Sequence, residues 1–337
     1  MGRPAAKTGK WLAAGLGCAG LFLLCGTLVF LLGRGSVPAG PAAPPFVAIE
    51  PGSGETDPST AGTTASSAAA SYPSVQPSGD PAREFTFPEE GRAALDTLLA
   101  GYEGVSVFYQ DVGSGAVYEY RSLEKYPAAS VVKAPYCLYV LDLASQGRAD
   151  LNQTFTYTEQ WMRKGTGKIQ NMPFGTVLTL RELVRYAIEE SDNVAFALIR
   201  SAFPADGYRA YAASFGLTYP EDIRNGANSL LCARDAGAYL AAIDRFIRTN
   251  PYGPELKASL QRTKNPMIRS SYPMARKYGW MEGAYHDMAI VYAPHPYRLA
   301  ILSNHDEGTK EDLRMFQVLK LSSFIQKTVS ARYKSCK

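Results

Sequence analysis

The chain has 337 residues, 46% of them hydrophobic, which is enough for one large domain or two modest ones with a sizeable core. Its net charge of +4 is small and scattered along the sequence, so composition gives no argument for a nucleic-acid partner. The five cysteines form no CxxC pattern and the three histidines are far apart, so we expect no metal site.

The first feature along the chain is an uncharged segment, residues 11–33. A helix of this length would measure roughly 35 Å, enough to cross the hydrocarbon core of a bilayer. The preceding residues 1–10 carry Arg3, Lys7 and Lys10, which the positive-inside bias keeps in the cytoplasm. We therefore expect a single-pass anchor in the cell membrane, with the rest of the chain extracellular.

A cleaved signal peptide is the alternative for residues 11–33, but the apolar region of such a peptide is usually shorter, at about 7–15 residues. A lipoprotein signal fits less well, because neither Cys18 nor Cys25 follows a Leu–small–small pattern.

Residues 34–85 are dominated by Pro, Gly, Ser, Thr and Ala and have no apolar periodicity. Such a segment cannot bury enough surface to offset the entropy of ordering, so we expect a disordered linker. Its root-mean-square span would be roughly 40 Å. The folded catalytic domain is then expected at 86–337.

Three cysteines lie beyond the linker, namely Cys137, Cys232 and Cys336. They permit at most one internal disulfide. We expect none, with Cys137 a buried thiol.

The domain is predicted to begin with a helix at 87–102, which has acidic residues in its first turn and leucines on one side. A β-hairpin follows at 104–122, where β-branched and aromatic residues flank a Gly-Ser-Gly turn. The segment 130–147 is apolar almost all the way round, which is typical of a helix buried in the middle of a protein. Most of residues 151–244 is also predicted to be helical.

Three short extended segments come next, at 274–280, 286–293 and 297–304, and a long amphipathic helix at 311–329 ends the domain. Hairpin and closing strands would form one sheet. We therefore predict a mixed α/β fold of the α+β type. It has an antiparallel five-stranded sheet flanked by terminal helices, and an all-helical subdomain inserted at about 130–265.

Ser130 and Lys133 form an S-x-x-K pattern at the start of the buried helix. Residues three apart on a helix share a face, and the first N–H groups of a helix are free to meet a developing oxyanion. A second S-x-x-K, at Ser122 and Lys125, lies in a polar stretch, so the pattern alone carries little weight. An N-cap serine with a surface lysine would explain either one.

Two further short motifs follow. Ser191, Asp192 and Asn193 form an S-D-N where the predicted helix at 180–190 ends, and a simple cap or turn would also explain them. Lys277-Tyr278-Gly279 falls on the first closing strand, where a lysine is usually a solvated charge.

Together, and in this order, these motifs resemble the S-x-x-K, S-D-N and K-T-G signature of class A β-lactamases and penicillin-binding proteins. The text around them is similar to that family as well: YPAASVVKAPYCLYVL, GTGKIQ with LRELVRYAIEESDNVA, and KYGWMEGAYHDMAIVYAP. The resemblance covers about residues 86–330. It implies a serine hydrolase that needs no metal and no organic cofactor.

Acyl-transfer chemistry and the resemblance give the main catalytic roles. Ser130 would attack a carbonyl carbon and become acylated. Lys133 would be its general base if burial and a second cation lower the pKa of its amine, and by resemblance Lys277 is that cation and attracts the substrate carboxylate. Ser191 would pass a proton to the leaving nitrogen.

The resemblance also implies four substrate-binding residues. Asn193 would hold Lys133 and the amide of the substrate. The backbone N–H groups of Ser130 and Trp280 would form the oxyanion hole, beside Gly279 on the same strand. Tyr278 stands where the family usually has Thr or Ser, and a phenol at this position would block or reshape the carboxylate pocket.

The deacylating carboxylate of class A enzymes is the second departure. Glu221 and Asn225 have the expected spacing, but Arg224 replaces the usual Leu and the following segment looks short. A solvated charged turn after Pro220 is the competing interpretation. Glu221 is therefore only a candidate, and β-lactamase efficiency is open.

The sequence favours an extracellular, membrane-anchored, monomeric β-lactamase-like hydrolase acting on β-lactams or related amides. A penicillin-binding D-alanyl-D-alanine peptidase with a cell-wall peptide substrate is the alternative. A non-catalytic cell-wall-binding module is a third interpretation, which would not require Ser130, Lys133, Ser191 and Lys277 together.

Overall fold

A computed structural model describes residues 89–223, 226, 229–264, 268–304 and 327. The predicted anchor and linker and almost all of the predicted C-terminal helix lie outside this part of the chain. Among the helices that it describes, none combines the length and the apolar character needed to span a bilayer.

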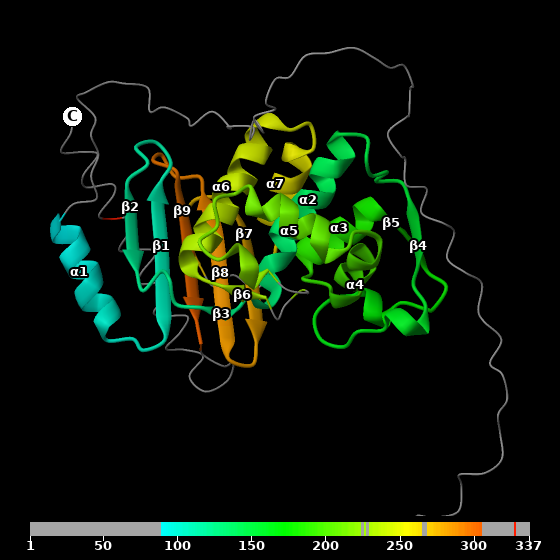
Figure 1. Cartoon of the computed structure of the whole chain (residues 1–337), viewed down its shortest axis with the longest axis horizontal. Helices are drawn as coiled ribbons and strands as arrows, with labels where there is room; N and C mark the ends of the chain where they lie inside the picture. Colours follow the sequence, from blue (N-terminus) through cyan, green and yellow to red (C-terminus); the bar gives the residue numbers. More distant parts are fainter. Residues whose placement is uncertain (1–88, 224–225, 227–228, 265–267, 305–326, 328–337) are drawn as a thin grey trace, which may run out of the picture. The chain divides into compact units, whose positions relative to one another are not determined.

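The described part begins with a helix and a pair of strands, continues with a mostly helical block and ends with three strands (Figure 1). The longer strands form one sheet: β1 (Val105–Asp111), β2 (Val117–Tyr120), β7 (Met274–Met281), β8 (Ala284–Val291) and β9 (Tyr297–Ser303). The α-helices are α1 (Glu89–Ala100), α2 (Lys133–Ser145), α3 (Leu180–Glu189), α4 (Asn193–Ala202), α5 (Ala205–Ala213), α6 (Ala233–Thr249) and α7 (Gly253–Gln261).

The sheet is antiparallel throughout, with strand order β2-β1-β9-β8-β7. The hairpin and the three closing strands therefore join as predicted, through pairs such as Val107 with Ile301 between β1 and β9. The order leaves β7 at one edge of the sheet, next to the helices α2 to α5 in the view of Figure 1.

Side chains along a strand point alternately to the two faces of the sheet. Each face of this sheet is covered by a hydrophobic cluster of its own. Val107 and Tyr109 of β1 pack in one cluster with Leu95 and Leu99 of α1. Phe108, between them, belongs to the other cluster, which the inserted helices dominate. The predicted first helix thus covers one face, and α6 contacts the other face through β1, β8 and β9.

The inserted segment is mostly helical, as predicted, but two small antiparallel ladders, one within it and one at its border, were not predicted from the sequence. These are β4 (Thr154–Thr156) with β5 (Val177–Thr179), and β3 (Tyr126–Pro127) with β6 (Leu230–Leu231). Each strand has only two or three residues, too few for a period-2 pattern to be recognised.

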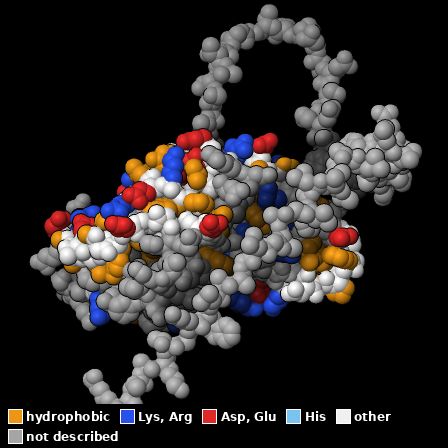
Figure 2. All heavy atoms as spheres, turned by 90° about the horizontal axis from the view of Figure 1, so that it is seen from below, with side chains coloured by type: hydrophobic (Ala, Val, Ile, Leu, Met, Phe, Trp, Pro, Cys, Tyr) orange, Lys and Arg blue, Asp and Glu red, His pale blue; other side chains and the backbone are white. Residues whose placement is uncertain are grey.

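Charged side chains of both signs lie interspersed over the face shown in Figure 2.

Buried positions in the described residues include the thiols of Cys137 and Cys232, both free, so the expectation for Cys137 is confirmed. In the same part of the chain, no three His, Cys, Asp or Glu side chains are grouped as metal ligands would be.

Candidate active site

Ser130 lies in a 3-10 turn, η2 (Ala129–Val132), which leads directly into α2. The prediction that Ser130 begins the buried helix is therefore wrong by one turn, since α2 itself begins at Lys133. The Lys133 N–H donates to the Ser130 carbonyl, and residues three apart in such a turn lie on the same side. Ala129 has φ +49°, a strained value for a residue other than glycine, of the kind that clusters at functional sites.

Lys133 is almost completely buried, and its Nζ is surrounded by acceptors from the S-D-N motif. It lies 2.5 Å from the carbonyl oxygen of Ser191, 2.8 Å from Oδ1 of Asn193 and 3.4 Å from Oγ of Ser191. A neutral amine has two N–H groups for the two nearest oxygens. Its lone pair is then left to accept a proton.

Lys277 reaches the same serine from β7. Its Nζ donates to Ser191 Oγ at 2.9 Å and to the Tyr278 carbonyl at 3.0 Å. The side chains of Lys277 and Ser191 are fully buried. The two predicted lysines thus meet at one hydroxyl, although 144 positions separate them in the numbering of the chain.

Burial lowers the pKa of Lys133 to about 7, because the ammonium form loses its hydration. Burial also lowers the pKa of Lys277 well below its usual value, and the charge of Lys133 is the second cause. Of the two causes expected to lower the pKa of Lys133, burial is the main one, and Lys277 is not among the groups that shift it.

Asp192, the middle residue of S-D-N, fixes the other two. Its buried carboxylate accepts hydrogen bonds from four backbone N–H groups: Val194 and Ala195 at the start of α4, both at 2.9 Å, and Lys168 and Ile169, at 2.7 and 2.9 Å. The motif is therefore an N-cap, as one alternative had it, and also the support of the site.

The segment Lys164–Ile169 packs against this motif, which the sequence analysis did not foresee. The Thr166 hydroxyl donates to the Ser191 carbonyl at 2.7 Å, and Asn193 Nδ2 donates to the Lys164 carbonyl at 3.0 Å. Gly167 has φ +115°, and a Cβ there would lie 2.3 Å from the Asp192 carboxyl carbon. The Gly-Thr-Gly sequence was the available indication of such close backbone packing.

Gly279 lies where β7 meets η2, the turn that contains Ser130. A Cβ on this residue would lie 2.9 Å from the backbone nitrogen of Ser130 and 2.8 Å from that of Val131. Strand alternation puts Lys277 and Gly279 on the same face of β7, so one face supplies both the second lysine and the close contact.

Tyr278 and Trp280 lie on the strand beside them. Tyr278 is buried in the cluster that contains α1 residues, and its ring centroid is 4.4 Å from Lys277 Nζ. The Trp280 side chain is 41% exposed. The structure therefore brings Ser130, Lys133, Ser191, Asn193, Lys277 and Gly279 into contact through the pairs above, with Tyr278 against Lys277.

Glu221 is not part of this set of contacts. It is exposed on the short turn η5 (Pro220–Asp222), and Lys125 is the charge beside it. In the part of the chain that the structure describes, no hydrogen bond or ion pair joins Glu221 to Ser130, Lys133 or Ser191.

The second S-x-x-K is engaged elsewhere. Lys125 Nζ lies 2.6 Å from Asp222 Oδ2 and 3.7 Å from the centre of the Tyr219 ring. Ser122 is buried, and its carbonyl accepts from the Arg234 N–H. These contacts fit a structural ion pair, so Ser130 is the serine with the active-site surroundings.

The family model described as "Beta-lactamase enzyme family" matches residues 91–322, about two thirds of the chain. The chain belongs to this family. A β-lactamase of Kitasatospora aureofaciens is 34% identical over 131 residues, 37% of this chain and 41% of that protein. The β-lactamase SME-1 of Serratia marcescens is 31% identical over 110 residues, 32% of this chain and 37% of that protein. Each match thus spans less than half of the curated β-lactamase.

Two solved structures share the fold over a longer stretch. PBP-A has a TM-score of 0.66 at 17% identity, covering 74% of this chain and 98% of its own. The β-lactamase from Sphaerobacter thermophilus has a TM-score of 0.63 at 19% identity, covering 72% and 98%. The predicted fold is confirmed by these likenesses and by the sheet itself.

The contact at Gly279 predicts a specific intolerance to a side chain. Gly279→Ala would force backbone atoms of η2 and β7 apart, since the atoms nearest the added methyl are backbone nitrogens. We expect a loss of about 1–3 kcal/mol in the free energy of unfolding, measured by denaturant titration. Gly101→Ala is the matched control, because the nearest atom there would be 3.6 Å away. Equal stability of the two variants would contradict the close contact.

Proposed function

We propose that the chain is a serine hydrolase that forms an acyl-enzyme at Ser130 with β-lactams or related amides. The supporting observation is that two buried lysines, Lys133 and Lys277, approach the hydroxyl of Ser191. Lys133 lies one turn after Ser130 in the chain. Burying two ammonium groups beside each other is costly, so the pKa values of both amines are lowered. Ionisable groups with such shifted pKa values cluster at the catalytic sites of enzymes.

The acylation step follows from these positions. Ser130 Oγ attacks the carbonyl carbon while its proton passes to neutral Lys133 Nζ. The developing oxyanion is held by the backbone N–H groups of Ser130 and Trp280, the latter assigned by resemblance. The carbon–nitrogen bond then breaks, and the leaving nitrogen takes a proton from Ser191 Oγ, which Lys133 and Lys277 can resupply.

The remaining residues orient the substrate. Asn193 is bound to Lys133 through Oδ1, which leaves its Nδ2 side to face the amide of the substrate, next to the Lys164 carbonyl. Lys277 is fully buried and the pKa of its amine lies well below the usual value, so we propose for it the hydrogen bond to Ser191 Oγ and not the attraction of the substrate carboxylate that the resemblance implies. Tyr278 has no short hydroxyl at the site for that carboxylate. We expect neither a metal nor an organic cofactor in this mechanism.

A penicillin-binding peptidase acting on D-alanyl-D-alanine peptides is the second candidate, and the exposed position of Glu221 favours it. Deacylation needs a base for the attacking water, and Glu221 is exposed on η5 with no contact to Ser130, Lys133 or Ser191 among the described residues. A mutant of PBP-A, which shares the fold of this chain, has been solved as an acyl-enzyme complex with penicillin G. A pure cell-wall-binding module, the third interpretation, gives no reason to bury Lys133 and Lys277.

We also propose that the catalytic domain is extracellular, monomeric and tethered by residues 11–33 in the cell membrane. The supporting features are the uncharged length of that segment and the three cations before it. Protease added to intact cells should release a soluble fragment that begins within residues 34–85. A mature protein found in the medium and starting just after residue 33 would contradict the anchor.

Acylation is tested by covalent labelling of the full-length chain with a fluorescent penicillin. Ser130→Ala should abolish labelling, whereas Ser122→Ala, the serine of the second S-x-x-K, should keep it. Lys133→Ala should slow labelling by at least about 10²-fold, as expected for a positioned general base, and Lys125→Ala should not. Unchanged labelling of Ser130→Ala would exclude the proposed nucleophile.

Turnover separates the two candidate functions. With a chromogenic cephalosporin we expect a burst of about one equivalent of product and then a slow steady state, because Glu221, the candidate base for the attacking water, is exposed and has no contact with Ser130, Lys133 or Ser191 among the described residues. Glu221→Gln should change the slow phase little. Fast multiple turnover that is lost in Glu221→Gln, with the burst retained, would instead establish a class A β-lactamase mechanism.

A further inference from the structure

His286 is a fully buried, titratable side chain that the proposed mechanism does not use. It lies on β8, directly opposite Gly279 of β7, and residues paired in this way point to the same face of a sheet. Gly279 is the residue at which an added Cβ would meet the backbone nitrogen of Ser130. His286 therefore lies on the face of the sheet against which η2 packs, and β8 itself contacts η2.

Both ring nitrogens of His286 are bound to backbone groups. The Ser303 N–H donates to Nδ1 at 3.1 Å, and Nε2 lies 2.8 Å from the Pro127 carbonyl oxygen. Because a backbone N–H only donates and a carbonyl only accepts, Nδ1 must be unprotonated and Nε2 must carry the hydrogen. Burial lowers the pKa of His286 to about 4, so the ring is neutral at pH 7 and keeps this tautomer.

The hydrogen bond to Pro127 acts on the segment that leads into the turn containing Ser130. Pro127 lies in β3, and Ala129, which begins η2, has the strained φ of +49°. A strained backbone persists only where the surrounding structure holds it. The bond from His286 joins the central sheet to the chain three residues before Ser130, and so contributes to holding this turn.

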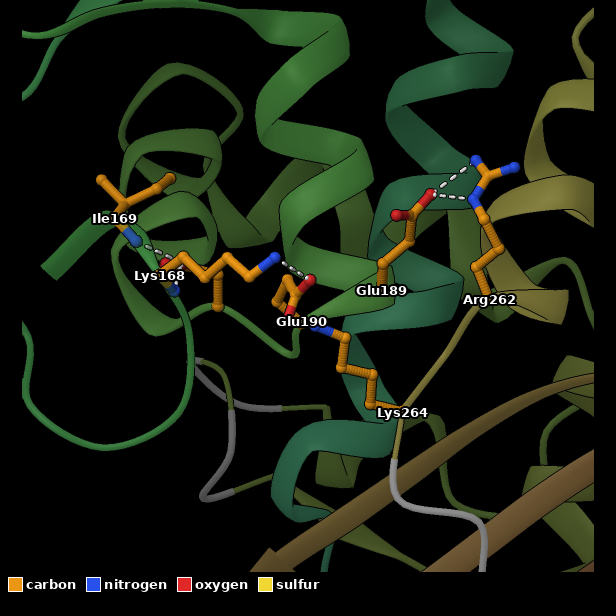
Figure 3. A network of polar contacts seen from close by, with 7 residues as sticks. Lys168, Ile169, Glu189, Glu190, Arg262 and Lys264 are labelled. Carbon is orange, nitrogen blue, oxygen red and sulfur yellow. Dashed lines mark hydrogen bonds and ion pairs between the residues drawn. The ribbon is translucent and has the colours of Figure 1, made fainter. Parts of the chain in front are cut away.

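The S-D-N side of the site is supported by ion pairs near the surface instead. Lys168 and Lys264 both pair with Glu190, the residue before Ser191, with Nζ to carboxylate distances of 2.8 and 2.7 Å (Figure 3). The two lysine side chains are 57% and 53% exposed, and ion pairs of such exposed groups contribute little. Water can replace a partner there, whereas it cannot easily do so at the buried ring of His286.

We propose that His286 is a positioning residue for the reaction of Ser130. Its Nε2–H holds the Pro127 carbonyl, and through the backbone it fixes η2, so that Ser130 Oγ keeps its place relative to Lys133. It acts through the chain and not on the substrate. The inference rests on the proposed acylation at Ser130, and its size follows from geometry, because a misplacement of about 1 Å can slow a reaction about 10²-fold.

Two amide variants separate the two hydrogen bonds of the ring. In His286→Gln the amide nitrogen can take the place of Nε2 and donate to Pro127, but the Ser303 N–H loses its acceptor. In His286→Asn the shorter side chain can place its amide oxygen near the position of Nδ1, but it cannot reach Pro127. Each variant leaves one buried backbone group without its partner, so both should lose similar stability in a denaturant titration.

The test is acylation of the full-length chain by benzylpenicillin. The dependence of the labelling rate on penicillin concentration gives the acylation rate constant and the dissociation constant of the initial complex. His286→Asn should lower the rate constant about 10- to 100-fold and change the dissociation constant little, because the nucleophile is displaced and the binding groups are not. His286→Gln should retain most of the rate constant.

Two control variants should leave the acylation rate constant unchanged. Tyr118→Phe removes a hydrogen bond of 2.7 Å to Asp96, between β2 and α1, so it lowers stability at a position remote from η2. Lys264→Gln removes one of the two exposed partners of Glu190 on the S-D-N side of the site.

The outcomes separate the positioning role from the proposed function. Equal rate constants in His286→Gln and His286→Asn, or a loss confined to the dissociation constant, would overturn the positioning role and leave the acylation mechanism standing. If His286→Asn does not fold, a large loss of the rate constant in folded His286→Gln would overturn it as well. An unmodified chain that benzylpenicillin does not acylate would contradict the proposed function and this inference with it.

Discussion

Desolvation of the two lysine ammonium groups around Ser191 is the constraint on which the rest of this site depends. Lys133 and Lys277 approach one hydroxyl oxygen, at 3.4 and 2.9 Å, in a region closed to solvent. In such surroundings two positive charges cannot both be retained cheaply. Burial lowers the pKa of Lys133 to about 7, so its amine is neutral above that pH, and we propose it as the base that takes the proton of the Ser130 hydroxyl.

The surrounding fold can be understood as the support that keeps this arrangement in place. Asp192 accepts hydrogen bonds from four backbone N–H groups, two at the start of α4 and two at the start of η4 (Ile169–Asn171) and the residue before it. Gly167 and Gly279 allow two backbone segments to approach closer than any side chain would permit. Ser191 itself has φ +53°, a strained value that these contacts enforce. Because β7 is an edge strand, the side of it that has no neighbouring strand can pack against η2, the turn that contains Ser130.

Much of this could be predicted from the sequence, since the large elements carry strong periodic patterns. The hairpin, the three closing strands and α3 were all expected, and the motif order identified Ser130, Lys133, Ser191 and Lys277. The contacts of these residues were less accessible, because they depend on tertiary packing. Nothing in the local sequence of Lys164–Ile169 indicates that it would pack on Asp192, apart from two glycines.

Glu221 illustrates the limit of a spacing argument. Its distance from Asn225 along the chain fits the family pattern, but the ion pair of Asp222 with Lys125 anchors the turn and leaves Glu221 exposed. Similarly, the replacement of a short hydroxyl by Tyr278 was visible in the sequence. Its burial in the hydrophobic cluster that also contains Leu95 and Leu99, with the ring near Lys277, depends on the register of β7 and could not be predicted from the sequence.

The pH dependence of the acylation rate constant of Ser130 tests the central claim most directly. Because burial lowers the pKa of Lys133 to about 7, the amine is protonated below that pH and available as a base above it. The rate constant should therefore rise through a midpoint near pH 7 and level off above about pH 8, and Lys133→Ala should remove this dependence. A midpoint near the ordinary lysine pKa of about 10.4 would show instead that Lys133 keeps its proton and is not the base.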